Sequence, residues 1–119
     1  MTDIYVFGSN LAGRHGAGSA KEARRKHGAI YGRGSGRQGN SYGIPTKGFE
    51  LQSLPLRDIK LFVDDFIDYA KAHQNLAFNI VKIGCGLAGY KEEQIAPLFK
   101  DAPSNCRLPP KWRELFTGE

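Results

Sequence analysis

The chain has 119 residues, of which 40% are hydrophobic, and a formal net charge of +5 at pH 7. This size and apolar content predict one folded domain over residues 1–119 and exclude a wholly disordered chain. No apolar run approaches the roughly 20 residues of a membrane span, and the first residues lack the pattern of a signal peptide, so we expect a cytoplasmic protein without membrane contact.

The first elements in chain order are a strand and a helix. Residues 4–7 (Ile-Tyr-Val-Phe) favour a short buried strand that ends at Gly8. Residues 19–27 predict a helix, because Ser19 and Glu22 have the spacing of a capping box and three basic residues precede a glycine stop. A strand followed by a helix is the start of an α/β unit.

A glycine-rich segment comes next. Residues 28–40 contain five glycines and two arginines, which predict a mobile basic loop with room for a short strand at 29–31. A second strand is expected at 42–44, closed by Pro45.

The second half of the chain contains the clearest helical pattern. Apolar residues between 59 and 70 recur at spacings of three and four, which predicts an amphipathic helix. The remaining elements are expected as a strand at 77–83, a helix at 92–100 that Pro97 kinks or starts, an edge strand at 107–108 and a last helix over 110–116. This alternation predicts an α/β domain with a largely parallel sheet.

Positive charge is concentrated in the first part of the chain. Residues 1–48 carry 8 Lys and Arg against 2 Asp and Glu, whereas residues 49–119 carry 9 against 10. The first segment also holds 11 of the 15 glycines. The partner of this basic surface should therefore be anionic, and phosphate is the first choice.

Cysteine and histidine do not form a metal-binding pattern. Cys85 and Cys106 are 21 positions apart, and none of the three histidines has a carboxylate at ligand spacing. We therefore expect reduced thiols, no metal and no cofactor.

Three segments share one design, in which a strand ends in small or glycine residues. They are residues 7–18, 44–48 and 83–90. Loops at the carboxyl ends of parallel strands converge, and their glycines let backbone N–H groups approach phosphate closely. These three loops predict a diphosphate-binding cradle, although each set of glycines also suits a simple tight turn. Arg14 and His15 border the first loop and are expected either to meet phosphate or to lie on the surface.

Two of these loops resemble those of the macrodomain family, which binds ADP-ribose. Residues 7–10 (Phe-Gly-Ser-Asn) with 16–18 (Gly-Ala-Gly) resemble the family's asparagine-bearing first loop and its turn into a helix, and residues 83–90 (Ile-Gly-Cys-Gly-Leu-Ala-Gly-Tyr) resemble its second diphosphate loop. The chain is most similar to the subclass that contains the terminal ADP-ribose protein glycohydrolase and the DNA-ADP-ribosyl glycohydrolases. The resemblance covers about residues 4–100 and implies a single three-layer α/β/α domain with a mostly parallel central sheet.

The resemblance also implies a set of site residues. The implied ligand-binding residues are Ser9, Asn10, Gly16, Ala17, Gly18, Gly84, Cys85, Gly86, Leu87, Gly89 and Tyr90. Lys47 falls on the position of the lysine that attacks the distal ribose in that subclass, and so becomes the implied catalytic residue. Ala88 stands where the subclass would place an assisting aspartate.

Several of these side chains also have a purely structural interpretation. Asn10 can satisfy its own backbone in a turn. Lys47 can be a solvated loop lysine, because a nucleophilic lysine needs burial or a neighbouring cation to become neutral. Cys85 is expected to fill space beneath its loop, and Tyr90 either packs over a ribose or caps the loop.

Three functions follow from these expectations. The first is binding of ADP-ribose, or of an ADP-ribosylated protein or nucleic acid, with hydrolysis of the ADP-ribosyl linkage through Lys47. The second is a non-catalytic module that binds an ADP-ribose-derived nucleotide, which Ala88 favours. The third is weak, non-specific nucleic-acid binding by the basic face of residues 14–47, where Tyr31 and Tyr42 stand among Arg33 and Arg37 and permit stacking on single strands.

Overall fold

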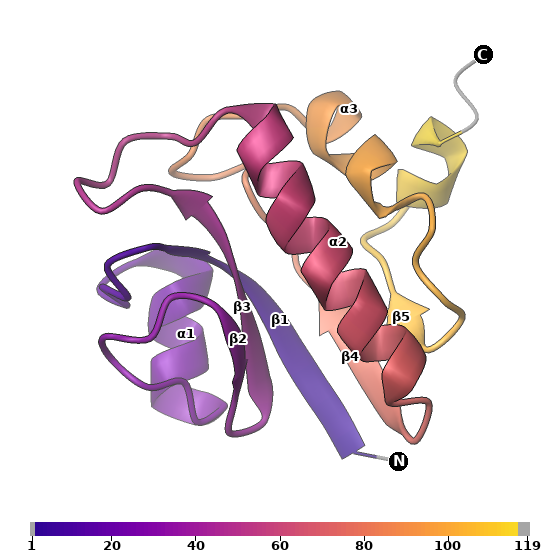
Figure 1. The fold of residues 1–119 in the computed structure, drawn as a ribbon, viewed down its shortest axis with the longest axis horizontal. Coiled ribbons are helices and arrows are strands. Elements are labelled where there is room, and N and C mark those ends of the chain that lie inside the picture. The colour runs from indigo at the N-terminus through magenta and orange to yellow at the C-terminus, as the bar shows by residue number, and fades with distance from the viewer. Residues whose placement is uncertain (1, 117–119) are drawn as a thin grey trace.

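A five-stranded mixed sheet of order β2-β3-β1-β4-β5 organises the structure, a computed structural model that describes residues 2–116 (Figure 1). The strands are β1 (Thr2–Asn10), β2 (Gly36–Gln38), β3 (Ser41–Lys47), β4 (Leu76–Ile80) and β5 (Cys106–Arg107). β1 pairs in parallel with β3 and β4, β4 pairs in parallel with β5, and β2 runs antiparallel to β3. The expected α/β domain with a mostly parallel sheet is confirmed.

Helices cover the sheet and connect its strands. They are α1 (Gly18–Lys26), α2 (Leu56–Ala72) and α3 (Glu92–Ile95), with two 3₁₀ helices, η1 (Ala96–Phe99) and η2 (Trp112–Leu115). The predicted amphipathic helix is confirmed as α2, because one side of it is buried through Ile59, Val63, Phe66, Ile67 and Ala70.

The two long helices pack on opposite faces of β1 (Figure 1). Successive side chains of a strand point to opposite faces. Ile4 and Val6 belong to the large hydrophobic cluster that contains the buried side of α2. Phe7 instead packs in a smaller cluster with Ala20 and Ala23 of α1. β1 is therefore the central strand, covered on both sides.

β1 and β3 are longer than the strands that the sequence predicts at 4–7 and 42–44. β1 continues past Gly8 to Asn10, and β3 continues through Pro45 to Lys47. Proline is tolerated at this position because β2 pairs with β3 only as far as Gly43, so no neighbouring strand needs the missing N–H on that side. The extension carries Asn10 and Lys47 to adjacent strand ends, where they are register partners.

The predicted capping box at the start of α1 is wrong. The N-cap is Ala17, which makes no side-chain capping hydrogen bond. The Ser19 hydroxyl instead accepts a hydrogen bond from the Gly8 backbone N–H at 3.3 Å, which ties the helix to β1. Glu22 forms an exposed ion pair with Lys26. The tertiary contact with β1 therefore competes successfully with local capping.

The glycine-rich segment forms no strand at 29–31, and that prediction is wrong. Its regular element is β2, and the part before β2 packs closely against the loop that follows β1. The Gly32 N–H donates to the Gly13 carbonyl at 2.8 Å, and the Ser9 hydroxyl donates to the Gly34 carbonyl. This approach requires glycine, since a Cβ on Gly13 would lie 2.2 Å from the carbonyl carbon of Gly32.

The last third of the chain contains shorter elements than predicted. β4 ends at Ile80, so the predicted extension of the strand to Ile83 is wrong. The helix predicted at 92–100 divides into α3 and η1, and Pro97 lies in the first turn of η1, as one of the two expected arrangements requires. The edge strand is confirmed as β5, and the last helix is the short η2.

Candidate functional site

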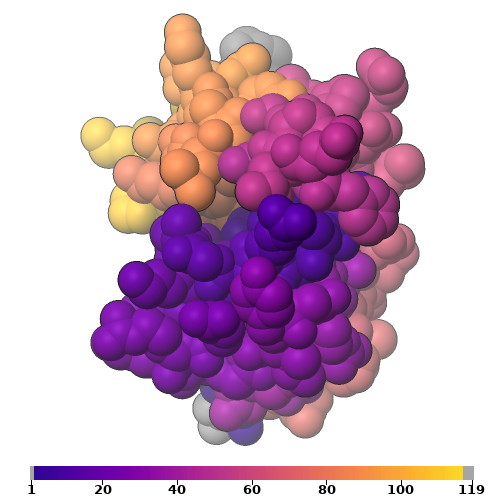
Figure 2. Space-filling view, turned by 90° about the vertical axis from the view of Figure 1, so that its left-hand side faces the viewer, coloured from indigo at the N-terminus to yellow at the C-terminus, as the bar shows by residue number. Residues whose placement is uncertain are grey.

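A cleft of about 710 Å³ opens at the carboxyl ends of β1, β3 and β4. The chain leaves β1 towards α1 on one face of the sheet and leaves β3 towards α2 on the other, which produces the crevice typical of open α/β sheets. Figure 2 looks onto this side, where the first third of the chain, in indigo to purple, meets segments from the later parts, in magenta and orange.

The cleft has two walls and a floor. We call residues 10–20 the first wall and residues 84–90 the second wall, and the end of β3 lies between them. The predicted site residues that line the cleft are Ser9, Asn10, Gly16, Ala17, Gly18, Lys47, Gly84, Gly86 and Leu87. The predicted residues Cys85, Gly89 and Tyr90 do not line it. The structure thus brings together residues from all three glycine-bearing segments.

The first wall presents open backbone to the cleft. A Cβ added to Gly16 or Gly18 would meet no atom within 4 Å, so both glycines border empty space. The N–H groups of Gly18, Ser19 and Ala20 begin α1 and donate to no other residue between 2 and 116. Because unpaired N–H groups at a helix start carry partial positive charge, this wall favours an anion.

The second wall has the same property. Within the described residues, the N–H groups of Gly86, Leu87 and Ala88 donate no hydrogen bond, and a Cβ on Gly86 would meet nothing within 4 Å. Gly84 differs, because its φ of +74° and the Ile95 side chain, 2.9 Å from the point that a Cβ would occupy, demand glycine for the turn itself. Gly86 is therefore free of any internal packing requirement.

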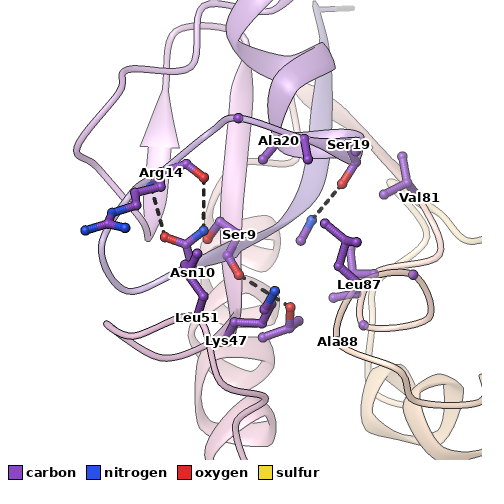
Figure 3. Close-up of a pocket in the computed structure, with 18 of the residues that line it drawn as sticks. Ser9, Asn10, Arg14, Ser19, Ala20, Lys47, Leu51, Val81, Leu87 and Ala88 are labelled. Carbon is purple, nitrogen blue, oxygen red and sulfur yellow. Dashed lines mark hydrogen bonds between the residues drawn. The ribbon is translucent and has the colours of Figure 1, made fainter.

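Asn10 uses its side chain to close the first wall. Its Nδ2 donates to the Arg14 carbonyl at 3.0 Å, and its Oδ1 accepts from the Arg14 N–H at 2.9 Å (Figure 3). This is the local backbone role that the sequence left as the alternative for Asn10. The amide shapes the loop and directs the Arg14 backbone.

Positive charge lines the cleft and negative charge does not. Arg14, Lys47 and Lys82 are lining residues, and the described lining contains no Asp or Glu. Lys82 forms an ion pair at 3.5 Å with Glu92, which does not line the cleft. Arg14 and Lys47 have no carboxylate partner among residues 2–116. A bound anion would supply that partner.

Cys85 and Tyr90 belong to the second wall but do not line the cleft. Burial, reinforced by Glu92, raises the pKa of the Cys85 thiol, which keeps the thiol protonated and unreactive at neutral pH. The Tyr90 hydroxyl donates to the Leu54 carbonyl, and the Tyr90 N–H donates to the Gly84 carbonyl at 2.8 Å. Of the two roles considered for Tyr90, the capping of its loop is the one seen in the structure.

The hairpin after β3 supplies lining that the sequence did not indicate. Leu51 lines the cleft, and the Ser53 hydroxyl donates to the Ala88 carbonyl at 2.7 Å, which joins the hairpin to the second wall.

Tyr31, which lies before β2, also lines the cleft, with the Arg24 guanidinium 5.4 Å from its ring centre. Leu51 and Tyr31 are apolar or aromatic residues close to glycines in the sequence, which is the one signal that could have indicated them. The sequence alone does not show that they lie at the same cleft.

His15 is neither a phosphate contact nor a surface residue, so both expectations for it are wrong. Its side chain is fully buried, edge-on to Phe7 at 5.4 Å and next to Tyr31 at 6.2 Å. Neither ring nitrogen makes a hydrogen bond of normal geometry, although an interaction with the Arg33 backbone partly opposes the effect of burial on the His15 pKa. Burial lowers the pKa of His15 below its ordinary value of 6.5.

Comparisons of the chain with protein-family models, with curated proteins and with solved structures give no match. Residues 2–116 contain no cluster of three His, Cys, Asp or Glu side chains suited to a metal ion. Over the same residues, no helix has the length and apolar content to cross a membrane. Function is therefore inferred from the chemistry of the cleft.

Proposed function

We propose that the cleft binds ADP-ribose, free or attached to a protein or nucleic acid, with the diphosphate between residues 16–20 and 84–88. One observation carries this proposal: two sets of unpaired backbone N–H groups border one cleft that is lined by cations and by no carboxylate. Backbone donors at a helix start and in a glycine loop suit phosphate oxygens. The volume of about 710 Å³ lies within the range of ordinary small-molecule sites.

A three-layer, macrodomain-like fold is part of the same proposal. Two features support it: α1 and α2 pack on opposite faces of β1, and the central strands run parallel. The two motifs that carry the resemblance also contribute lining residues to a single cleft. In a mostly parallel sheet with helices on both faces, ligands bind in the crevice at the carboxyl ends of the strands.

Lys47 is the proposed nucleophile if the domain also removes ADP-ribose. Its neutral amine would attack C1″ of the distal ribose, the bond to the protein or nucleic acid would break, and that group would leave with a proton. Opening of the sugar ring gives a Schiff base, which water hydrolyses to free ADP-ribose and the lysine. No carboxylate in the described lining is available to activate water directly.

A binding module without catalysis is the second proposed function, and Ala88 favours it. Ala88 lines the cleft where an acid would be needed to assist ring opening and release. Without that group, the Schiff base would turn over slowly or would not form.

Calorimetry with ADP-ribose at moderate salt tests the binding proposal. The parent should bind, and Gly86→Val should lose more than about 1.4 kcal/mol of binding free energy, a tenfold change, because its branched side chain occupies the space beside the free N–H groups. Ala72→Val is the matched control, since it adds bulk at the exposed end of α2. Equal binding by the parent and Gly86→Val would exclude the second wall as the cradle.

An ADP-ribosylated substrate tests the chemistry. The parent, Lys47→Ala and Ala88→Asp are compared for release of ADP-ribose, and a hydride reductant is added to trap the lysine adduct. Activity that disappears in Lys47→Ala, with an adduct on Lys47 of the parent, supports the lysine mechanism. Activity unchanged in Lys47→Ala excludes it, and an inactive parent that gains activity in Ala88→Asp identifies a binding module on a hydrolase scaffold.

A further inference from the structure

The hairpin that follows β3 has an unusual residue at its tightest position. The Gly48 N–H donates to the Gln52 carbonyl at 2.7 Å, the Leu51 N–H donates to the Gly48 carbonyl at 3.0 Å, and Lys47 bridges to Ser53. The hairpin loop is therefore residues 49–51. The last residue of such a three-residue loop adopts a left-handed conformation, for which glycine is the usual choice.

Leu51 adopts this conformation with a φ of 65°. A side chain strains the backbone there, because Cβ approaches the following carbonyl oxygen. Between residues 2 and 116, eight glycines occupy other positive-φ positions, and the only further non-glycine residue with positive φ is Lys111. A leucine rather than a glycine at position 51 therefore requires an explanation other than the conformation of the turn.

Core packing does not provide that reason. Leu51 belongs to neither hydrophobic cluster and is 36% exposed. Its side chain lines the cleft on the same side as Lys47 (Figure 3). The hydrogen bond from the Ser53 hydroxyl to the Ala88 carbonyl holds the hairpin against the second wall. Backbone strain that persists at the edge of a binding cleft is typical of residues that serve the ligand.

We infer that Leu51 contacts the distal ribose of the ligand and so selects ADP-ribose over ADP. This inference rests on the proposed function, which puts the diphosphate between the two walls and the distal ribose beside Lys47. The C–H face of a ribose is apolar and packs on an exposed leucine, whereas ADP lacks that sugar. Contact with the ligand removes from water a side chain that the empty cleft leaves partly exposed.

Calorimetry with ADP-ribose and with ADP tests the inference on the parent, Leu51→Gly and Leu51→Asn. Both replacements suit a left-handed position, so the melting temperature should stay equal or rise. Loss of the apolar contact should weaken ADP-ribose binding about fivefold to tenfold and change ADP binding by less than about twofold. Lys111→Gly relieves the same backbone conformation away from the cleft and should change neither affinity.

The possible outcomes separate this inference from the proposed function. If the parent binds ADP-ribose and both Leu51 variants bind it equally well, the inference is overturned and the proposed function stands. Equal weakening of ADP-ribose and ADP binding also overturns it, because the side chain would then not act on the distal ribose. A parent that binds neither compound overturns both.

Discussion

The two walls of the cleft offer the same backbone donors but are held in place differently. The first wall is packed backbone to backbone against the segment before β2, through contacts such as Gly13 with Gly32 and Gly34 with Asn10. The second wall is joined to the hairpin mainly by side-chain hydrogen bonds from Ser53 and Tyr90. We therefore expect the first wall to be more rigid than the second wall, whose attachment rests on fewer backbone contacts.

The walls also differ in chemistry. The first wall leads into α1, which carries exposed cations, and it includes Arg14. The second wall presents Leu87, which is 71% exposed, and it adjoins Leu51 through the Ser53 hydrogen bond. This difference indicates that the first wall attracts an anion and the second wall contributes an apolar surface.

The largest expected effect is the difference between alanine substitutions at Gly34 and Gly16, two glycines without a positive φ. In Gly34→Ala the new Cβ would lie 2.2 Å from the Asn10 carbonyl oxygen, so we expect a loss of about 3 kcal/mol or more in the free energy of unfolding. Gly16→Ala meets nothing within 4 Å and should change stability by less than about 0.5 kcal/mol. Denaturant titration measures both. Comparable stability of the two variants would show that the first wall can shift to accommodate a side chain at position 34 at little cost in stability.

The salt dependence of nucleic-acid binding should distinguish the basic helix α1, which follows the first wall, from the rest of the surface. If about three cations contact phosphates, non-specific nucleic-acid affinity should fall roughly 40-fold between 50 and 200 mM salt. The double variant Lys21→Glu, Arg25→Glu removes exposed cations of α1 and should flatten this dependence, whereas Lys71→Glu on α2 should not. Filter binding at several salt concentrations measures the slopes. Tight binding that survives 0.2 M salt, without ADP-ribose binding, would favour a nucleic-acid-binding function.

His15, the buried histidine of the first wall, should make the stability of the fold depend on pH. Because its folded-state pKa is lowered, the unfolded chain binds the proton more readily, so the stabilisation is complete above about pH 6.5 and is lost as pH falls. We therefore expect the free energy of unfolding to decrease as the pH is lowered from about 6.5 to 5. His15→Phe keeps a ring against Phe7 and should remove this slope in urea titrations at each pH. A slope that persists in the variant would have to arise from other groups.

The smallest effect is expected at the second wall. Ser53→Ala removes one exposed hydrogen bond to Ala88 and should cost less than about 1 kcal/mol of stability. The same change should accelerate hydrogen exchange at the Tyr90 N–H, because the loop is then held by fewer contacts. Ser104→Ala, at another exposed serine, serves as the control. Unchanged exchange at Tyr90 would mean that the second wall does not depend on the hairpin.

The sequence predicts the elements whose signals are local. Helix α2 follows from its apolar spacing, and the meeting of Asn10, Lys47 and the 84–90 loop follows from the geometry of parallel strand ends. The burial of His15 and the lining role of Leu51 depend on contacts between distant segments and on backbone conformation, which residue patterns do not encode. The capping box at Ser19 failed for the same reason, since a contact with Gly8 took its hydroxyl.

Pro45 has a consequence for association between molecules. β2 covers β3 only as far as Gly43, and the returning arm of the hairpin covers the end of β3, where the Leu54 N–H donates to the Thr46 carbonyl at 2.9 Å and Lys47 bridges to Ser53. Among residues 2–116, the short stretch of β3 around Pro45 lies between these two neighbours and pairs with neither. An exposed edge invites another strand to pair and is a common start of aggregation. A proline in that stretch removes one of the N–H groups that such pairing requires. This short edge beside the cleft is thereby protected against pairing with a second molecule and stays open to a small ligand.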